Sequence, residues 1–309
     1  MEGVMMRKGA NYALALRLPD GSITVRRMPW FFLTRLPLLK KPFLRGFPLL
    51  VETLVNGIRA LNISVEAVAG EEHNPVTKRQ LVLTVILAFA MAIGLFVVGP
   101  HFLSLLMRGL RLGGDVEGLT FHLWDGFFKC CVFLAYIRLI ALTPEIRRVF
   151  QYHGAEHKSI HAWEAGGEIT AARAETMSRL HPRCGTTFLL FVICLSVVLH
   201  ALLVPLFLYF HMPQSVAVKH GAVLLLKLLL VMPISAVAYE LIRYAARLPD
   251  GPRAAILRAP GLALQKFTTC EPDRSQVDVA LVALREALGP EEGSHIKTAP
   301  YKKELETCA

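Results

Sequence analysis

Long apolar runs separated by polar segments are the dominant pattern of this chain. Four runs are long enough for a helix that crosses a bilayer, which needs about 20 apolar residues. They cover residues 81–107, 121–142, 187–210 and 221–241. Gly99 and Pro100 predict a kink in the first run. The second run carries Asp125, Lys129 and Arg138, so these side chains must face protein or lie at the membrane interfaces.

The segments outside the runs predict smaller elements. Two β-prone stretches within residues 12–26 flank Pro19-Asp20-Gly21, which predicts a β-hairpin in the region 1–27. Residues 28–80 mix apolar stretches with prolines and basic residues, and Trp30 favours an amphipathic helical segment at the membrane interface. A soluble helical hairpin packed on the strands explains that pattern equally well. In the region 242–309, Asp273 caps an amphipathic helix, and the polar stretch 290–309 is expected to be disordered.

The composition supports a membrane protein. Of the 309 residues, 54% are hydrophobic and the mean hydropathy is +0.46, which is more apolar than a typical soluble domain. The net charge is +10, and the Lys and Arg residues gather outside the runs: twelve before residue 81, six in 143–186 and ten after 241. The positive-inside rule then places both termini and the segment 143–186 in the cytoplasm.

The expected fold is therefore mainly α. It is a multi-pass membrane protein with about four transmembrane helices and a small cytoplasmic α+β part that includes the hairpin. The transmembrane helices lie in residues 81–142 and 187–241. The lipid bilayer is the first expected partner, and no nucleic acid is expected because no basic run is interleaved with aromatic residues. The six cysteines lack a disulfide-framework spacing and are expected to be reduced.

The central segment 143–186 carries the chemistry. Its sequence Tyr-His-Gly-Ala-Glu-His contains an H-x-x-E-H pattern formed by His153, Glu156 and His157. Pro144 after a threonine and a later pair of glycines predict one helix around the pattern. Histidines four apart share a helix face and can bind one metal ion, with a carboxylate beside them as general base. The alternative is a pair of core histidines whose ring nitrogens are satisfied by hydrogen bonds.

A second motif, Arg-Leu-His-Pro-Arg-Cys-Gly, precedes the third run and offers His181 and Cys184 as further ligands. If all four groups bind a divalent metal, zinc or iron, the shell is closed and the site is structural. With three ligands, a position stays open and Glu156 can act as base. Other carboxylates could replace Cys184: Glu2, Glu175 or Glu240. His161 lies about 12 Å along the helix axis from His153, so one ion should not bind both ends of this histidine ladder.

Several motifs resemble the YqhQ-like family of bacterial membrane proteins (domain of unknown function 1385). They are Glu-Gly-Val-Met-Met-Arg at 2–7, Leu-Pro-Asp-Gly at 18–21, Tyr-His-Gly-Ala-Glu-His-Lys at 152–158, His-Pro-Arg-Cys-Gly at 181–185 and Pro-Gly-Leu-Ala-Leu-Gln with Thr-Thr and Glu-Pro-Asp at 260–273. The resemblance spans nearly the whole chain and implies a multi-pass inner-membrane protein with a metal-dependent enzyme activity. Family members usually carry Gly-Gly-Gln-Ala-Val before the first motif, so the natural start is expected upstream of Met1.

The leading interpretation is metal-assisted hydrolysis at the cytoplasmic membrane face, where a lipid-linked or membrane-proximal substrate would be within reach. The alternative is a non-enzymatic scaffold or assembly factor whose structural metal clamps the central segment. A transporter is disfavoured, because the ionisable residues within the runs are few and form no evident pathway along the sequence.

Overall fold

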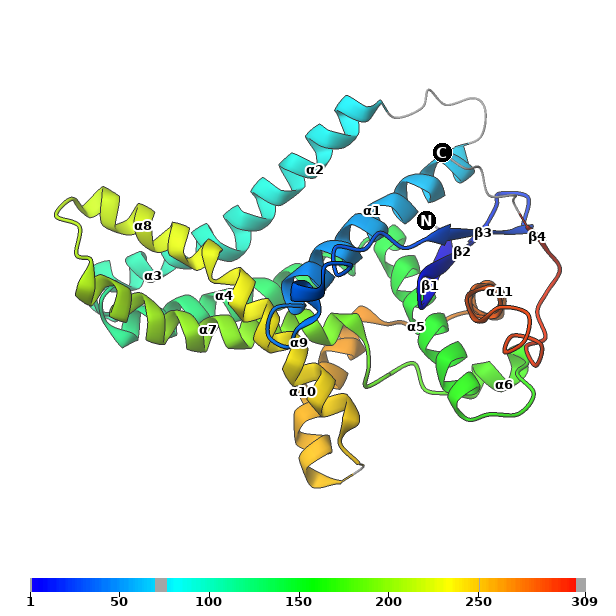
Figure 1. Cartoon of the computed structure of the whole chain (residues 1–309). Helices are drawn as coiled ribbons and strands as arrows, with labels where there is room; N and C mark the ends of the chain where they lie inside the picture. The colour runs from blue at the N-terminus through cyan, green and yellow to red at the C-terminus, as the bar shows by residue number, and fades with distance from the viewer. Residues whose placement is uncertain (1, 70–76, 250, 304–309) are drawn as a thin grey trace.

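The computed structural model describes residues 2–69, 77–249 and 251–303 (Figure 1). Its strands are β1 (Gly3–Lys8), β2 (Asn11–Arg17), β3 (Ile23–Pro29) and β4 (Tyr301–Lys303). Its helices are α1 (Gly46–Ala69), α2 (Lys78–Ile93), α3 (Gly99–Gly109), α4 (Leu119–Ile140), α5 (Pro144–Glu164), α6 (Ala171–Glu175), α7 (Gly185–Phe210), α8 (Val216–Leu229), α9 (Val231–Arg247), α10 (Pro252–Thr268) and α11 (Arg274–Leu288). The fold is mainly helical with one small sheet.

The predicted hairpin is confirmed and belongs to a larger sheet. β1, β2 and β3 form an antiparallel meander, and β4 pairs with β3 in parallel. The turn between β2 and β3 is stabilised by Asp20, whose Oδ1 accepts hydrogen bonds from the backbone N–H and the hydroxyl of Ser22 at 2.9 and 2.7 Å. Gly21 adopts the positive φ of +82° that this turn needs.

The C-terminal stretch differs from the expectation of disorder. Residues 290–303 are ordered, and the remaining residues of the stretch lie outside the described part of the chain. Tyr301 donates a hydrogen bond of 2.6 Å to Glu286 of α11, and Lys303 forms an ion pair of 2.9 Å with the same carboxylate. Ile296 is 1% exposed in the core beside α11. A few anchoring side chains therefore order a segment that is polar in composition.

The sheet is covered on both faces. α5 and α11 pack on one face, with α6 packed against these two helices, and they share a core with β1, β2 and β3. α1 packs on the other face, where Ala60 contacts Tyr12, Leu14 and Trp30. Residues 28–80 were predicted either to lie at the membrane interface or to form a helical hairpin packed on the strands. In the structure α1 packs on the strands, as a single helix and not as a hairpin. Trp30 is 4% exposed and bonded to Glu52 at 3.2 Å, so it is a core residue and not a membrane anchor.

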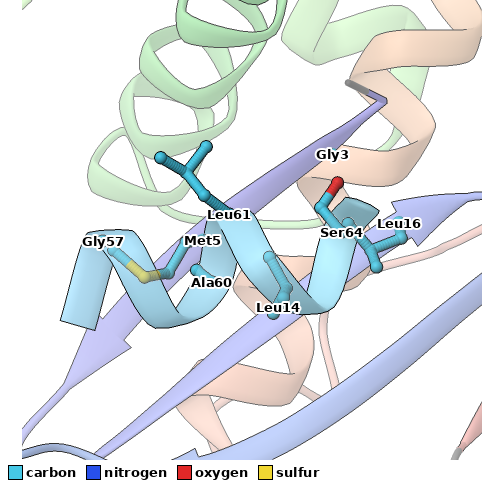
Figure 2. Close-up of a pocket in the computed structure, with 8 residues that line it drawn as sticks. All are labelled: Gly3, Met5, Leu14, Leu16, Gly57, Ala60, Leu61 and Ser64. Atoms are coloured by element: carbon cyan, nitrogen blue, oxygen red, sulfur yellow. The ribbon is translucent and has the colours of Figure 1, made fainter. Parts of the chain in front are cut away.

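A small apolar cavity of about 220 Å³ remains between α1 and the sheet. Figure 2 shows Gly57, Ala60, Leu61 and Ser64 of α1 above residues of β1 and β2. A Cβ added at Gly57 would meet no atom within 4 Å, so the helix is loosely packed at this point.

Within the described residues, three helical segments have the length and composition to cross a membrane: Arg79–Gly109, Gly185–Phe210 and Val216–Arg247. α4 meets these criteria only together with α5, from which it is bent by 98°. The described part of the chain therefore has three candidate spans, or four if this pair is counted. Where a kink was predicted in the first span, the structure has a π-helical turn, Gly94–Val98, which ends directly before Gly99 and Pro100. In Figure 1 the apolar helices lie at one end of the molecule and the sheet at the other.

Candidate metal centre

Helix α5 carries both motif histidines, and its ends agree with the prediction. It begins at Pro144 and is followed by Gly166 and Gly167, which have φ values of +68° and +78°. Gly154, inside the motif, is a packing residue, because a Cβ there would overlap the carbonyl oxygen of Cys270. The segment that follows α10 therefore lies directly against the motif.

His153, His157 and Cys184 each bring one ligand atom to within 4.8 Å of the others. His153 Nε2 lies 3.1 Å from Cys184 Sγ, and the two imidazole centroids are 4.4 Å apart. Zinc binds histidine nitrogen and cysteine sulfur at about 2.0–2.3 Å in a tetrahedral shell, so ligand atoms around one ion stand close together in this way. The donor set and its spacing fit zinc, with iron as the second choice.

Backbone carbonyls select the tautomer of both histidines. Because a carbonyl oxygen can only accept, His153 Nδ1 donates to Thr268 O at 2.8 Å and His157 Nδ1 donates to Arg179 O at 2.6 Å. The Nε2 lone pair of each ring is then available. Metal-binding histidines are commonly oriented by such a hydrogen bond from the other ring nitrogen.

Cys184 is the N-cap residue of α7 and is 8% exposed. Its sulfur accepts a hydrogen bond from the backbone N–H of Thr186 at 3.4 Å and lies 3.1 Å from the Thr186 hydroxyl. A thiolate sulfur is the form of cysteine that binds metal. The cluster is therefore located where an apolar, membrane-length helix begins.

His181 lies in a second, neighbouring group. Its Nδ1 accepts the backbone N–H of Arg183 at 3.2 Å, and its Nε2 lies 3.4 Å from Glu164. The second group consists of His161, Glu164 and His181, with the two ring centroids 4.6 Å apart. Burial lowers the pKa of His181 to about 4, although Glu164 opposes this shift, so the ring is neutral at pH 7. Of the four predicted ligands, His153, His157 and Cys184 thus lie in one group and His181 lies in the other.

His161 and Glu164 were not among the predicted ligands. The signal was present, since both follow the H-x-x-E-H pattern on the same helix at four and seven residues from His157. His161 donates through Nε2 to Leu180 O at 2.9 Å, and Glu164 also pairs with Arg183. Hydrogen bonds and ion pairs to Leu180 and Arg183 thus hold this second group in place.

The Gln-x-x-Thr-Thr motif at the end of α10 holds the histidine loop in place. Gln265 is fully buried and bonds both backbone groups of His181: its Oε1 accepts the N–H at 2.7 Å and its Nε2 donates to the carbonyl at 2.8 Å. Thr269 O accepts from the Arg179 guanidinium at 2.5 Å. Residues that the sequence offered only as part of a family motif therefore support the cluster directly.

Glu156, the predicted base, lies one helical turn from His153, beside the cluster. Burial raises the pKa of the Glu156 carboxyl, and the nearby His153 ring reduces that rise. A carboxylate whose pKa is raised accepts a proton more readily, which suits general-base chemistry.

Two of the three alternative carboxylate ligands, Glu2 and Glu240, are engaged elsewhere. Glu2 bonds Arg148 at 2.7 Å and the hydroxyl of Tyr152 at 2.8 Å, and Glu240 forms two bonds of 2.7 Å with Arg45. Lys158, the last residue of the Tyr-His-Gly-Ala-Glu-His-Lys motif, is buried. It is 5% exposed and donates to the carbonyl oxygen of Glu175 at 2.7 Å.

These features define a helical protein with several membrane-length apolar helices, an N-terminal sheet and a His/Cys cluster where one apolar helix begins. The chain belongs to the family described as protein of unknown function DUF1385, whose model matches residues 41–290. It is similar to Uncharacterized protein YqhQ of Bacillus subtilis (strain 168), with 32% identity over 302 residues that cover 93% of this chain and 90% of that protein. The family resemblance seen in the motifs is confirmed. No solved structure matches the chain.

Proposed function

We propose that the chain is a multi-pass inner-membrane enzyme that uses a divalent metal, zinc by preference, to hydrolyse a membrane-proximal or lipid-linked substrate. The observation that carries the proposal is the convergence of His153, His157 and Cys184, with both histidine tautomers selected by carbonyl oxygens. Those three residues would hold the metal. When bound, a divalent metal supplies Lewis acidity that polarises a carbonyl or phosphoryl oxygen.

The chain's own residues have separate tasks in this proposal. Glu156 takes up the proton of the attacking water, because it is half-buried one turn from His153 and the pKa of its carboxyl is raised. His181 stays outside the group of three, bonded to Arg183 and facing Glu164, which leaves one coordination position free. Gln265 holds the loop that carries His181 in position through two hydrogen bonds to its backbone.

The location supports the substrate class. Cys184 is the N-cap of α7, which continues for 26 mainly apolar residues, so the cluster lies at the predicted cytoplasmic end of a span. Large exposed apolar side chains cover the outer faces of the helices, among them Leu87 at 67%, Phe102 at 59% and Leu202 at 61%. Exposure of this extent is expected in contact with lipid and not with water. A substrate held in the bilayer would reach the cluster without leaving the bilayer.

The scaffold alternative has one observation in its favour. Cys184 takes part in the cluster, and a thiolate with two histidines ties α5 to the start of α7 as a structural metal would. A fourth protein ligand would close the shell and exclude catalysis.

The test is metal analysis of full-length protein in detergent, followed by cobalt substitution. We expect about one zinc per chain, lost in His153→Ala and retained in Arg147→Ala, an exposed residue of the same helix. Azide should change the visible spectrum of the cobalt form if a coordination position is open. An unchanged spectrum would support the scaffold, and a wild-type protein without metal would overturn both proposals.

A further inference from the structure

Ionisable side chains converge inside the helical bundle, at the end far from the His153 cluster. Six of them come from four helices and are each at most 4% exposed: His101 of α3, His122, Asp125 and Lys129 of α4, His200 of α7 and Lys227 of α8. The sequence led us to expect no pathway among the ionisable residues of the runs. The structure corrects that expectation, because residues that are scattered along the chain meet between the helices.

The first half of the series begins near the surface at His220, which is partly exposed near the start of α8. His220 Nδ1 lies 3.0 Å from His101 Nε2, and His101 Nδ1 lies 3.3 Å from Lys227 Nζ. Lys227 then donates to Asp125 Oδ1 at 2.7 Å. These contacts form one continuous line of hydrogen-bonding atoms from the partly exposed ring to the buried carboxylate.

The second half continues across the bundle. Asp125 Oδ2 lies 3.6 Å from Lys129 Nζ, which donates to His200 Nδ1 at 3.2 Å and to Ser196 Oγ at 3.4 Å. His200 is 16 residues from Cys184 on α7, or about 24 Å along the helix. The series therefore ends near the middle of the bundle, well short of the His/Cys cluster.

The charges in this series do not balance. Two ammonium groups, Lys129 and Lys227, share the single carboxylate of Asp125. His122 Nδ1 and His200 Nε2 are buried and have no hydrogen-bond partner in the part of the chain that the structure describes. An uncompensated buried charge is costly, and a proton is the smallest species whose departure removes it.

An apolar layer closes the series toward the His/Cys cluster. Phe133 and Ile137 of α4 and Leu264 of α10 are buried together, with Leu190 and Ile193 of α7 packed against them. At the opposite end Lys219 pairs with Glu117 next to His220. The line of polar groups is thus open at one end of the bundle and blocked at the other.

We propose that this series is a proton half-channel that exchanges one proton between the solution at the His220 end and the lysine pair in the middle of the bundle. The proposal depends on the membrane location proposed above and not on the metal. In the observed arrangement, a proton of Lys227 passes to His101 Nδ1, the proton on His101 Nε2 passes to His220 Nδ1, and the proton on His220 Nε2 leaves to water.

Each transfer breaks one N–H bond and forms another, so the net result is one proton released and one ammonium neutralised. The reverse sequence reloads the site from solution. The half-channel gives the protein a means of coupling its bundle to the proton concentration on the side opposite the His/Cys cluster.

The test uses full-length protein in phospholipid vesicles adsorbed on a solid-supported membrane, with a rapid pH jump of the bathing solution. A half-channel moves charge part of the way across the bilayer, so we expect a transient current that reverses sign with the direction of the jump and decays to zero. In His101→Phe, which keeps the aromatic contact with Phe121 at a centroid distance of 5.1 Å, the current should fall to that of protein-free vesicles.

His220→Phe, at the partly exposed end, is the second variant and should behave as His101→Phe does even if the buried substitution impairs folding. Arg138→Gln, an exposed residue of α4, and the metal-ligand variant His153→Ala should keep the wild-type current, which separates this proposal from the enzymatic one. Absence of the transient in wild type, a transient unchanged in His220→Phe, or a sustained current would each overturn the half-channel.

Discussion

Gln265 binds both backbone groups of His181, accepting its N–H at 2.7 Å and donating to its carbonyl at 2.8 Å, although 84 residues separate the two along the chain. A buried amide that mimics a strand partner in this way holds the histidine loop against α10. The geometry of the candidate metal centre therefore depends on a helix that contributes no ligand side chain of its own.

Gln265→Ala should destabilise the protein by roughly 2–4 kcal/mol, because it leaves two backbone groups of His181 buried and unpaired. Thermal unfolding in detergent measures the change, and Lys266→Ala, on the exposed neighbouring position, is the control. Metal content should fall in the same variant. A melting temperature equal to that of Lys266→Ala would contradict the supporting role of Gln265.

Cys184→Ser should reduce zinc content, because a serine hydroxyl is a poorer ligand than a thiolate for this metal. Cys194→Ser is a matched control, since Cys194 is an exposed cysteine of the same helix. Both variants are measured by metal analysis of the purified protein. Equal zinc in the two would exclude Cys184 from the site and leave the two histidines as its remaining members.

Glu156→Gln should retain zinc and the cobalt–azide response while losing function, because the amide keeps the shape of the side chain and removes its ability to accept a proton. The readout is metal content together with rescue of a strain that lacks the gene. Full metal with full rescue would rule out Glu156 as the base and would favour the scaffold.

Replacing two helical glycines by alanine should change the stability of the protein in opposite directions. Gly154→Ala places a Cβ against the carbonyl of Cys270 and should destabilise by about 1–3 kcal/mol through strain. Gly57→Ala meets open space inside α1 and should stabilise by up to about 1 kcal/mol through helix propensity. Denaturant or thermal unfolding of the two variants measures both changes in stability. If both variants were stabilised, or both destabilised, one of the two packing assignments would be wrong.

The contact between Glu2 and α5 should weaken in acid. Burial opposes ionisation of Glu2, but the hydrogen bonds from Arg148 and Tyr152 outweigh it and lower the pKa of Glu2 below its ordinary value. A lowered folded-state pKa contributes stability above the ordinary glutamate pKa, and this contribution is lost as the pH falls through the folded value.

The stability difference between wild type and Glu2→Gln should accordingly be present at pH 7, at about 1 kcal/mol or less because the pair is partly exposed, and vanish in strong acid. Unfolding midpoints at several pH values measure it. A difference that persists unchanged at the acid end would mean that the amide disturbs packing and not charge.

Local sequence patterns were sufficient for the elements whose identity depends on neighbouring residues. The α5 boundaries at Pro144 and at Gly166 follow from residues within one turn, and the β2–β3 turn follows from Pro19-Asp20-Gly21. The apolar runs predicted the long helices for the same reason, since length and composition decide whether a helix can span a bilayer.

Tertiary structure alone decided which residues meet. The pattern on one helix could not show that His181 lies beside Glu164 and His161, because its position depends on Gln265 and Arg183 outside that helix. Trp30 looked like an interface anchor by type and is buried by Glu52 and α1.

The ionisable residues of the bundle show most clearly what the sequence predicts and what only tertiary packing decides. Their positions in the sequence are known without a structure, and each is an ionisable side chain in an apolar helix. Whether such charges form a connected series depends on how four helices rotate about their axes and pack, and packing is set by side chains of all four at once. The sequence by itself determined the helices and their chemistry, while their mutual packing decided the cluster around His153 and the line of groups from His220 to His200.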